Sequence, residues 1–567
     1  MAEIKRVLDT IKECIDNKKS FVLDAGAGSG KTYTLMETIE YLDTKKFAKN
    51  QQILCITYTN AGKEEIENRI QRKVLKNNIL VSTIHDFIWS YVKRFQLELN
   101  KILKILIEND IEKLTLAKDD ALRKLSKPKS NTDIEKQKEI VEKNTRKLEK
   151  YKDVNIDSLV VDYDLYKAMY KGKVSHDEII QIMINLLNKR EFIQLFTSNF
   201  PYIIIDEYQD TNFDLLNILI KIVNESQKSI IGLYGDSMQR IYEKNNISLE
   251  NAGLYRIEKL DNYRTNIKIV KANNILRGDG LEQNCNNQNP QIEFKELLFI
   301  YNKSQDFKLE HYTTLQNNFN QYKRLYLSNK YIADELGFSH IANLFNNKFK
   351  QNANEELFKL KEPMINFIVS QVVVLVNNTS KEIFQDIIKK LKFTTLAELS
   401  SLKEEIVFTF SNIDDSISSI IDFCIAKNLV SRKRFEELIN YDDDEFYTSL
   451  LNIPLKEFLA LDEQITGNTS LDTLHGVKGL EFDNVIINLH QDQSWTTYNF
   501  DKLIKDENVD SKSVQNAHKL LYVACTRARK SLIINYIANP ENILDFETLK
   551  NNVINKFGKD IYIAEYN

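Results

Sequence analysis

The 567-residue sequence contains few glycines, prolines and cysteines, and its positive and negative charges nearly cancel. The five cysteines show no CxxC spacing, which argues against a disulfide scaffold, a zinc site and an iron–sulfur cluster. They are Cys14, Cys55, Cys285, Cys424 and Cys525. No apolar run approaches the ~20 residues that span a bilayer, and the first residues lack the apolar segment of a signal peptide. We therefore expect no membrane partner and a cytoplasmic location.

Charge and length set the next limits. The net charge of −4 excludes a uniformly basic nucleic-acid-binding protein, although a local basic track would be sufficient for such binding. The chain is too long for a single hydrophobic core, so several domains are expected.

Strand-like apolar runs alternate with helical segments along much of the chain. The expected strands cover residues 21–24, 53–57, 80–83, 202–205, 230–234, 291–294, 324–327, 486–488 and 532–535. This alternation is typical of parallel sheets with crossover helices. Two mainly helical stretches, at about 100–155 and 346–455, interrupt it. The sequence therefore predicts an α/β protein with two cores, each carrying a mainly helical insertion.

The first helical stretch is charged and is broken at Pro128. Residues 133–151 are rich in lysine and glutamate and have few apolar side chains, which is typical of a solvated helical hairpin. Contact between these lysines and a DNA backbone is the alternative. The sequence alone leaves both open.

A glycine-rich segment, AGAGSGKT at residues 25–32, follows the first expected strand. Glycines let backbone N–H groups surround the phosphates of a nucleotide, the lysine reaches the β- and γ-phosphates, and the threonine hydroxyl binds Mg²⁺. A helix follows the loop and brings its N-terminus to the phosphates. The segment therefore predicts an NTP site, with a glycine-rich strand–helix turn as the alternative. Its residues are Ala25, Gly26, Ala27, Gly28, Ser29, Gly30, Lys31 and Thr32.

Two adjacent carboxylates follow the expected strand at 202–205. In doubly wound folds, ligands bind at the edge of the sheet where the strands end. Asp206 is suited to hold Mg²⁺, directly or through water, and Glu207 to orient or deprotonate the attacking water. Together with the phosphate loop, the pair predicts NTP hydrolysis.

Eight motifs occur in the order found in UvrD/Rep-like superfamily 1 helicases, which the chain resembles over nearly its whole length. They are AGAGSGKT at 25–32, TYTNA at 57–61, TIHDF at 83–87, DEYQD at 206–210, GDSMQRIY at 235–242, NYR at 262–264, TLHGVKGLEF at 473–482 and YVACTRAR at 522–529. The resemblance implies two RecA-like parallel-sheet cores in tandem and an ATP-dependent DNA helicase that uses Mg²⁺.

The resemblance also implies roles for single residues. Gln209 and Gln239 would sense the γ-phosphate and the attacking water. Phosphoryl transfer needs positive charge against the developing oxyanions. Arg264 and Arg527 would supply it as arginine fingers that reach across from the second core.

The sequence contains only some of the residues with which the family recognises the base and the ribose of the nucleotide. By the resemblance, Tyr263 would stack on the base and Glu481 would contact the ribose. No glutamine precedes Gln51, so the adenine-reading glutamine that the family carries upstream of the phosphate loop is missing. This absence weakens the prediction of a strict preference for ATP over other NTPs.

Single-stranded DNA would run over both cores by the same resemblance. The positions that the family uses for it are Tyr58, Asn60, His85, Tyr242, Thr473 and His475. Aromatic faces stack on any base without reading its sequence. From the residues alone, core aromatics and hydrogen-bonded structural histidines stay open as alternatives.

The sequence departs from the family after Tyr242, where it reads EKNN in place of an aromatic residue followed by Arg-Gly-Ala. A base-stacking wedge and an arginine are lost, which argues against efficient strand separation. The second insertion is short, and about 40 residues follow Arg527, so we expect no fused nuclease domain. This compact build resembles the GajB-type helicase-like subunits of Gabija anti-phage systems, which work beside an OLD-family nuclease.

The sequence thus predicts an ATP-dependent translocase or helicase on single-stranded DNA, with 3′–5′ movement implied by the resemblance. The alternatives are a DNA-stimulated NTPase acting as the sensor or regulatory subunit of an anti-phage nuclease complex, and a degenerate, non-enzymatic scaffold. The first core is expected at 1–90 and 180–258 with an insertion at 91–179. The second is expected at 259–345 and 456–567 with an insertion at 346–455.

Overall fold

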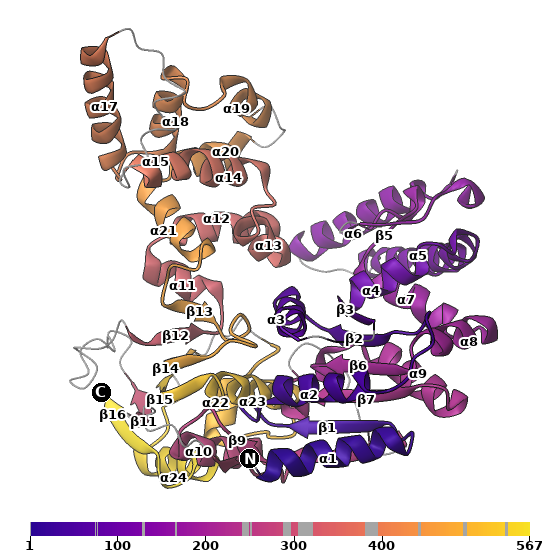
Figure 1. The fold of residues 1–567 in the computed structure, drawn as a ribbon. Coiled ribbons are helices and arrows are strands. Elements are labelled where there is room, and N and C mark those ends of the chain that lie inside the picture. The colour runs from indigo at the N-terminus through magenta and orange to yellow at the C-terminus, as the bar shows by residue number, and fades with distance from the viewer. Residues whose placement is uncertain are drawn as a thin grey trace. The chain divides into compact units, whose positions relative to one another are not determined.

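The computed structural model of the chain describes residues 2–73, 75, 78–126, 131–152, 154–164, 167–240, 249, 252–286, 296–303, 321–379, 395–439, 444–490, 496–538 and 543–566. The chain forms two compact units. The first consists of Met1–Arg264 with Arg277–Gln288, and the second of Thr265–Leu276 with Asn289–Asn567. Each unit is built on a six-stranded sheet (Figure 1).

The sheet of the first unit has the strand order β3-β2-β6-β7-β1-β8, and all neighbouring strands in it are parallel. Its strands are β1 (Phe21–Ala25), β2 (Ile53–Thr57), β3 (Ile79–Thr83), β6 (Tyr202–Asp206), β7 (Ile230–Gly235) and β8 (Tyr255–Lys259). Every residue of β1, β2 and β7 is buried, as expected for parallel strands covered on both faces. Because the strands are parallel, their carboxyl ends meet at one edge of the sheet.

Helices cover the two faces of this sheet and form separate apolar cores. On one face, Phe21 and Leu23 pack with α1 (Ala2–Asp16), α2 (Lys31–Asp43) and α3 (Asn60–Gln71). On the other face, Val22 packs with α4 (Ile84–Val92) and α9 (Phe213–Ser226). Successive residues of β1 enter different cores because side chains alternate between the faces of a strand.

A mainly helical insertion lies between α4 and β6. Its long helices, α5 (Gln96–Leu125) and α6 (Asn131–Glu149), lie side by side (Figure 1), so the predicted helical hairpin is confirmed. Pro128, the predicted break, lies outside the described residues. The insertion continues through the paired strands β4 (Asp162–Tyr163) and β5 (Lys173–Val174) to α7 (His176–Leu186) and α8 (Arg190–Asn199).

The sheet of the second unit has the order β13-β12-β14-β15-β11-β16, and its neighbouring strands are also parallel. The strands are β11 (Glu296–Asn302), β12 (Lys323–Tyr326), β13 (Leu471–Thr473), β14 (Phe482–His490), β15 (Ala528–Ile537) and β16 (Tyr562–Tyr566). The helices that belong with it include α10 (Ile267–Arg277), α22 (Phe500–Lys505), α23 (Lys512–Cys525) and α24 (Phe546–Phe557).

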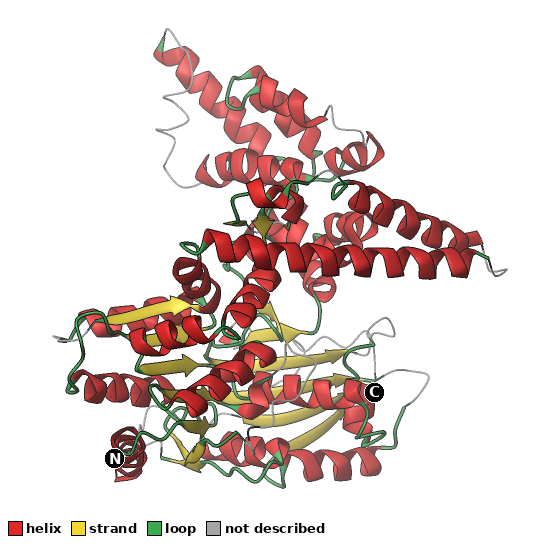
Figure 2. Ribbon diagram, turned by 90° about the vertical axis from the view of Figure 1, so that its right-hand side faces the viewer, coloured by secondary structure: helices red, strands yellow, loops and turns green. Residues whose placement is uncertain are grey.

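The second unit carries its own insertion, which is built of helices (Figure 2). They are α11 (Asn329–Leu336), α12 (Ser339–Phe349), α13 (Ala353–Phe358), α14 (Pro363–Phe367), the π-helix η8 (Ile368–Val373), α15 (Val374–Thr379), α17 (Leu396–Ser411), α18 (Ile417–Ala426), α19 (Arg432–Ile439), α20 (Asp444–Leu451) and α21 (Leu455–Ile465). The run Ala353–Asn378 is long and apolar enough to cross a membrane by length and composition, but 56% of its most apolar window is buried inside the protein. A core helix of this insertion explains that composition.

The predicted fold class is confirmed: two parallel-sheet cores of the RecA-like α/β kind follow one another, and each has a mainly helical insertion. The expected strand at 291–294 lies outside the described residues. The sheets also contain β8, β11, β13 and β16, which were not expected from the sequence. The predicted domain boundaries stay predictions.

Candidate functional site

The phosphate loop connects β1 to α2 at the carboxyl edge of the first sheet. Gly28 and Gly30 both have a φ of 78°, which glycine adopts far more readily than a residue with a Cβ. Gly30 is the N-cap of α2 and provides no side-chain cap, so the first N–H groups of this helix have no partner within it. Backbone donors and a helix N-terminus at one place suit the binding of an anion.

Two side chains of the loop are suited to a phosphate ligand. Lys31 Nζ donates a hydrogen bond to the Ala25 carbonyl at 3.3 Å, so its ammonium group lies across the loop. Ser29 is fully buried, and its hydroxyl has no hydrogen-bond partner among the described residues. A buried hydroxyl without a partner is unfavourable. A phosphate oxygen in the loop would satisfy it.

The two carboxylates at the end of β6 have different environments. Asp206 is buried, and burial followed by the charge of Glu207 raises its pKa to about 7, while the charge of Lys31 acts in the opposite direction. Glu207 has a left-handed backbone with a φ of 49°, a conformation that is uncommon outside glycine and is found at functional turns. The electrostatic interaction of Lys31 with Asp206 joins the phosphate loop and the acid pair in one site.

A hydrogen-bonded chain connects both predicted glutamines to this acid pair. Gln209 Nε2 donates to Glu207 Oε2 at 2.5 Å, and Gln209 Oε1 accepts from the Asp236 backbone N–H at 3.2 Å. Asp236 Oδ2 accepts from Gln239 Nε2 at 2.8 Å. A Cβ at Gly235 would stand only 2.2 Å from Gln209 Oε1. Asp236 therefore connects the two glutamines, although it was not predicted as a site residue.

The residues present also fit a nucleotide-bound magnesium ion. Thr32 and Asp206 carry the oxygen ligands that Mg²⁺ prefers. The described part of the chain holds no group of three or more His, Cys, Asp or Glu side chains able to bind a metal, so Mg²⁺ here would need phosphate oxygens and water as further ligands. Burial, followed by the charge of Glu207, raises the pKa of Asp206 and disfavours its charged form. A bound cation would favour that form.

A downstream segment of the first unit braces the outer side of the phosphate loop. The two short strands β9 (Asp261–Asn262) and β10 (Asn284–Cys285) pair there. Asn262 Nδ2 and Gln283 Nε2 both donate to the Ala27 carbonyl, at 2.9 and 3.2 Å. A Cβ on Gly26 would stand 2.5 Å from the amide carbon of Gln283. Sequence reasoning missed Gln283, because a single glutamine in a loop carries no local signal of this contact.

Tyr263 and Arg264 also lie against the phosphate loop. The Tyr263 backbone N–H donates to the Gly28 carbonyl at 3.0 Å, and the Tyr263 hydroxyl donates to Asp261 Oδ2 at 2.8 Å. The Arg264 Cβ is 2.9 Å from the place where a Cβ on Gly28 would stand. The first compact unit extends to Arg264.

The second unit contains Arg527 and Glu481. Arg527 is buried, and its guanidinium donates to the carbonyls of Val523 and Leu480 at 2.9 and 3.2 Å and to Thr526 Oγ1 at 2.9 Å. Glu481 is exposed and directly follows Leu480. One arginine therefore fixes the backbone beside the residue predicted to contact the ribose.

The predicted DNA positions of the first unit follow β2 and β3. Tyr58 is 40% exposed, and Asn60 is the exposed first residue of α3. The ring of His85 stacks on His176 with centroids 4.3 Å apart, and His176 Nδ1 lies 2.7 Å from the Tyr163 hydroxyl. Burial, followed by the charge of His176, lowers the pKa of His85 to about 4. His85 is therefore a neutral ring at neutral pH.

The other DNA positions are Thr473 and His475 in the second unit and Tyr242. Thr473 Oγ1 accepts from the Gly476 backbone N–H at 2.9 Å, and His475 Nε2 lies 2.8 Å from the Tyr498 hydroxyl. Burial lowers the pKa of His475 to about 4. Tyr242 and the departure at 243–246 lie outside the described residues.

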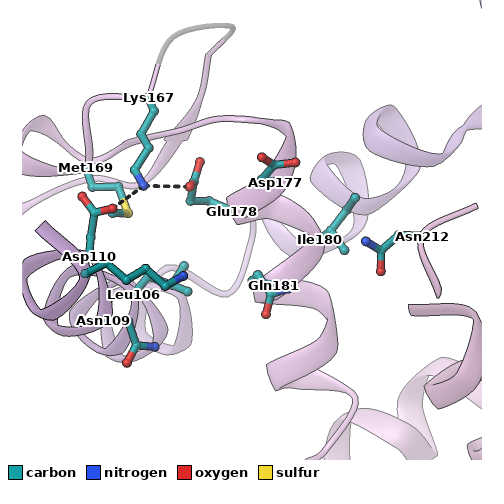
Figure 3. Close-up of a pocket in the computed structure, with 11 residues that line it drawn as sticks. Leu106, Asn109, Asp110, Lys167, Met169, Asp177, Glu178, Ile180, Gln181 and Asn212 are labelled. Atoms are coloured by element: carbon teal, nitrogen blue, oxygen red, sulfur yellow. Dashed lines mark hydrogen bonds and ion pairs between the residues drawn. The ribbon is translucent and has the colours of Figure 1, made fainter. Parts of the chain in front are cut away.

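A polar cavity of about 590 Å³ in the first unit lies between α5 and α7 and reaches Asn212, the N-cap of α9 (Figure 3). Lys167 bridges Asp110 and Glu178 there, at 2.7 and 3.1 Å (Figure 3). This bridge ties α5 and α7 to the segment that carries Lys167. It was not predicted from the sequence.

Comparison with known proteins shows which families the sequence resembles. Residues 10–252 match the UvrD/REP helicase N-terminal domain, and residues 417–535 match the viral superfamily 1 RNA helicase core domain. The Gabija protein GajB of Bacillus cereus strain HuB5-5 is 26% identical over 96% of this chain and 96% of its own. The ATP-dependent DNA helicase PcrA of Staphylococcus aureus strain Mu50 is 24% identical over 95% of this chain and 83% of its own. A probable DNA helicase II homolog of Mycoplasma capricolum is 23% identical over 95% and 86%.

The match to the UvrD/REP domain spans the phosphate loop, the acid pair and both glutamines. The relatives extend the similarity over nearly all of the second unit as well. The chain is therefore a superfamily 1 helicase-like protein whose residues 10–252 match the UvrD/REP helicase N-terminal domain.

Proposed function

We propose that the protein is an ATP-dependent translocase or helicase on single-stranded DNA, moving 3′ to 5′ as the family resemblance implies. The observation that carries the proposal is the hydrogen-bonded chain from Glu207 through Gln209 and Asp236 to Gln239. Beside it lies a phosphate loop whose buried Ser29 hydroxyl has no partner among the residues that the structure describes. An assembly of this kind serves to sense and hydrolyse the terminal phosphate of a nucleotide.

The residues of the first core would divide the reaction between them. Lys31 and the N-terminus of α2 bind the phosphates, and Thr32 and Asp206 hold Mg²⁺. The bound Mg²⁺ supplies charge neutralisation at the phosphate oxygens. Glu207 takes the proton of the attacking water, and Gln209 keeps the carboxylate oriented through its hydrogen bond of 2.5 Å.

The remaining site residues complete the proposal by resemblance. Arg264 and Arg527 stabilise the charge that develops on the transferred phosphoryl group, and Gln239 senses the γ-phosphate. Tyr263 stacks on the base and Glu481 contacts the ribose. By the same resemblance, the nucleotide is hydrolysed between the two RecA-like cores.

The DNA track would combine aromatic stacking with polar contacts. Tyr58, His85 and Tyr242 offer rings on which the bases can stack. The lowered pKa of His85 leaves its ring uncharged at neutral pH, which suits this role. Asn60, Thr473 and His475 would contact the strand as polar partners. A cytoplasmic location is part of the same proposal.

The second candidate function is a DNA-stimulated NTPase that senses DNA for a nuclease partner of the OLD family and unwinds little. Two observations favour it. The sequence at 243–246 replaces the wedge and arginine of the family, and GajB, a Gabija protein, is similar over 96% of its length.

Two assays on the full chain test the proposal. Hydrolysis of ATP with Mg²⁺ is measured with and without single-stranded DNA, and strand separation is measured on a 3′-tailed duplex. Both activities are expected for a helicase. Hydrolysis stimulated by DNA without strand separation favours the sensor, and no hydrolysis in any condition contradicts both enzymatic functions. Comparison of ATP with GTP tests the effect of the missing adenine-reading glutamine.

A further inference from the structure

Arg277 is a buried arginine that contacts three carboxylates of the first unit. Its side chain is 1% exposed. Nη1 lies 2.7 Å from Asp236 Oδ1, Nε lies 2.6 Å from Asp279 Oδ1, and Nη2 lies 3.6 Å from Asp24 Oδ1. Asp24 and Asp236 are themselves buried. Neither Arg277 nor Asp24 was a predicted site residue.

The two buried carboxylates lie on neighbouring strands. The register of β1 and β7 pairs Asp24 with Gly235, directly before Asp236. Burial and then the charge of Asp236 raise the pKa of Asp24. Burial also acts to raise the pKa of Asp236, but Arg277 and Lys31 outweigh it, so this pKa is lowered. Asp236 is therefore held as a carboxylate, with the Arg277 guanidinium 2.7 Å from its Oδ1.

The two oxygens of Asp236 face different partners. Oδ1 receives the Arg277 guanidinium at 2.7 Å, and Oδ2 receives Gln239 Nε2 at 2.8 Å. The backbone N–H of the same residue donates to Gln209 Oε1. An arginine fixes the plane of a carboxylate better than a point charge does, because its donors have a rigid planar geometry. The orientation of the Asp236 carboxylate, and with it that of Gln239, thus depends on Arg277. Gln209 is coupled to the same residue through its backbone N–H.

We propose that Arg277 is a positioning residue for nucleotide hydrolysis, which acts through Asp236 on Gln209 and Gln239. This inference rests on the proposed function, because it assigns the residue to that reaction. Since the glutamines would act on the γ-phosphate and the attacking water, their misplacement lowers kcat more than it changes KM.

A second role of Arg277, the neutralisation of buried charge, must be separated from positioning. Arg277→Gln alone leaves Asp24 and Asp236 with too little positive charge, and loss of one partner of a buried ion pair is strongly destabilising. The test therefore uses Arg277→Gln in an Asp24→Asn background, which removes one cation and one anion together. Asp24→Asn alone is the reference, and Arg277→Lys in the same background restores charge without the planar fork. Arg256→Gln is the surface control, because Arg256 pairs with Asp24 at 3.0 Å but is 54% exposed.

The experiment measures kcat and KM for ATP with Mg²⁺ and single-stranded DNA, together with the melting temperature of each variant. The inference predicts that Arg277→Gln in the Asp24→Asn background lowers kcat about 10- to 100-fold from the Asp24→Asn value while KM stays within about threefold. Arg277→Lys recovers part of the loss, and Arg256→Gln leaves kcat unchanged.

Two outcomes would contradict the positioning role of Arg277. A kcat within about twofold of the Asp24→Asn reference shows that Arg277 only neutralises charge. A wild-type chain without hydrolysis removes the proposed function itself, and with it the reaction that Arg277 would serve. The two failures are distinguished by the wild-type rate.

Discussion

Gln209 fixes the carboxylate of Glu207 through a hydrogen bond of 2.5 Å from Nε2 to Oε2. The backbone of Glu207 is left-handed at this point, with a φ of 49°, so the main chain and the side chain are both constrained. A carboxylate held in this manner is suited to act on one water molecule, because a general base depends on its position before its pKa.

Replacement of Glu207 by glutamine tests this assignment. The amide keeps the size of the side chain but cannot accept the proton of water, so nucleotide binding is expected to remain while turnover falls about 10²- to 10⁴-fold. Binding is measured with a fluorescent ATP analogue and turnover by phosphate release. Lys31→Ala is the matched comparison, since it is expected to lose binding as well. Full turnover by Glu207→Gln would show that another group activates the water.

The Gln283 amide packs against Gly26 and leaves no room for a side chain at this position. In Gly26→Ala the new methyl group meets the Gln283 amide, whose carbon lies 2.5 Å from the Cβ position. We expect the variant to lose roughly 1–3 kcal/mol of stability and to bind nucleotide more weakly, because the amide can no longer brace Ala27. Gln283→Ser in the same chain is expected to recover part of the lost stability by removing the clash, but not the binding, because serine cannot restore the brace to Ala27. Chemical denaturation measures the stability, and ATP-analogue titration measures the binding.

Gly28→Ala is the control for that pair. Its φ of 78° strains any residue that has a Cβ, and the atoms that such a Cβ would meet belong to Arg264 and Asn262 and not to Gln283. Gln283→Ser should therefore give no recovery in a Gly28→Ala chain. Equal recovery in both glycine variants would contradict the contact between Gly26 and Gln283.

Tyr58 is predicted to stack on DNA bases. Tyr58→Ala should weaken binding to oligo-dT by about 1–3 kcal/mol, the contribution of one stacked base. Tyr255→Ala is the control, because Tyr255 is 50% exposed on β8 compared with 40% for Tyr58 and belongs to no helicase motif. Fluorescence anisotropy measures both affinities. Equal losses of oligo-dT affinity in the two variants would contradict the proposed contact of Tyr58 with DNA.

His490 makes the stability of the protein depend on pH. Its ring stacks on Tyr331 with centroids 4.2 Å apart, and burial lowers its pKa from the ordinary 6.5 to about 4. Between these two values the unfolded chain binds the proton and the folded chain does not, so the free energy of unfolding should fall as pH falls from about 6.5 to about 4. His490→Phe keeps the stacked ring and should reduce this slope. An unchanged slope in urea denaturation across that range would contradict the shift.

Much of the site followed from the sequence, because its residues stand next to each other or directly after a strand. Asp206 ends the apolar strand β6, Glu207 directly follows it, and Lys31 follows the glycines that form the turn. Contacts between distant segments could not be predicted in this way. Gln283 donates a hydrogen bond to Ala27 across 256 positions. A single glutamine between Glu282 and Asn284 forms no pattern that points to such a partner.

The strands show the same limit. β8 reads YRIEK, and its buried Lys259 hides the apolar alternation expected of a strand. β13 has only three residues, too few to show a period. β11 reads ELLFIYN and is almost wholly buried, a composition that fits a buried helix as well as a central strand. The sheet neighbours, which lie far along the chain, decide between these possibilities.

The rate of ATP hydrolysis by the full chain with Mg²⁺, with and without single-stranded DNA, tests the central claim most directly. A nucleotide-driven motor with Glu207 as its base predicts measurable hydrolysis that DNA increases, and loss of that rate in Glu207→Gln. A wild-type rate indistinguishable from that of Glu207→Gln, with DNA present, would contradict the account.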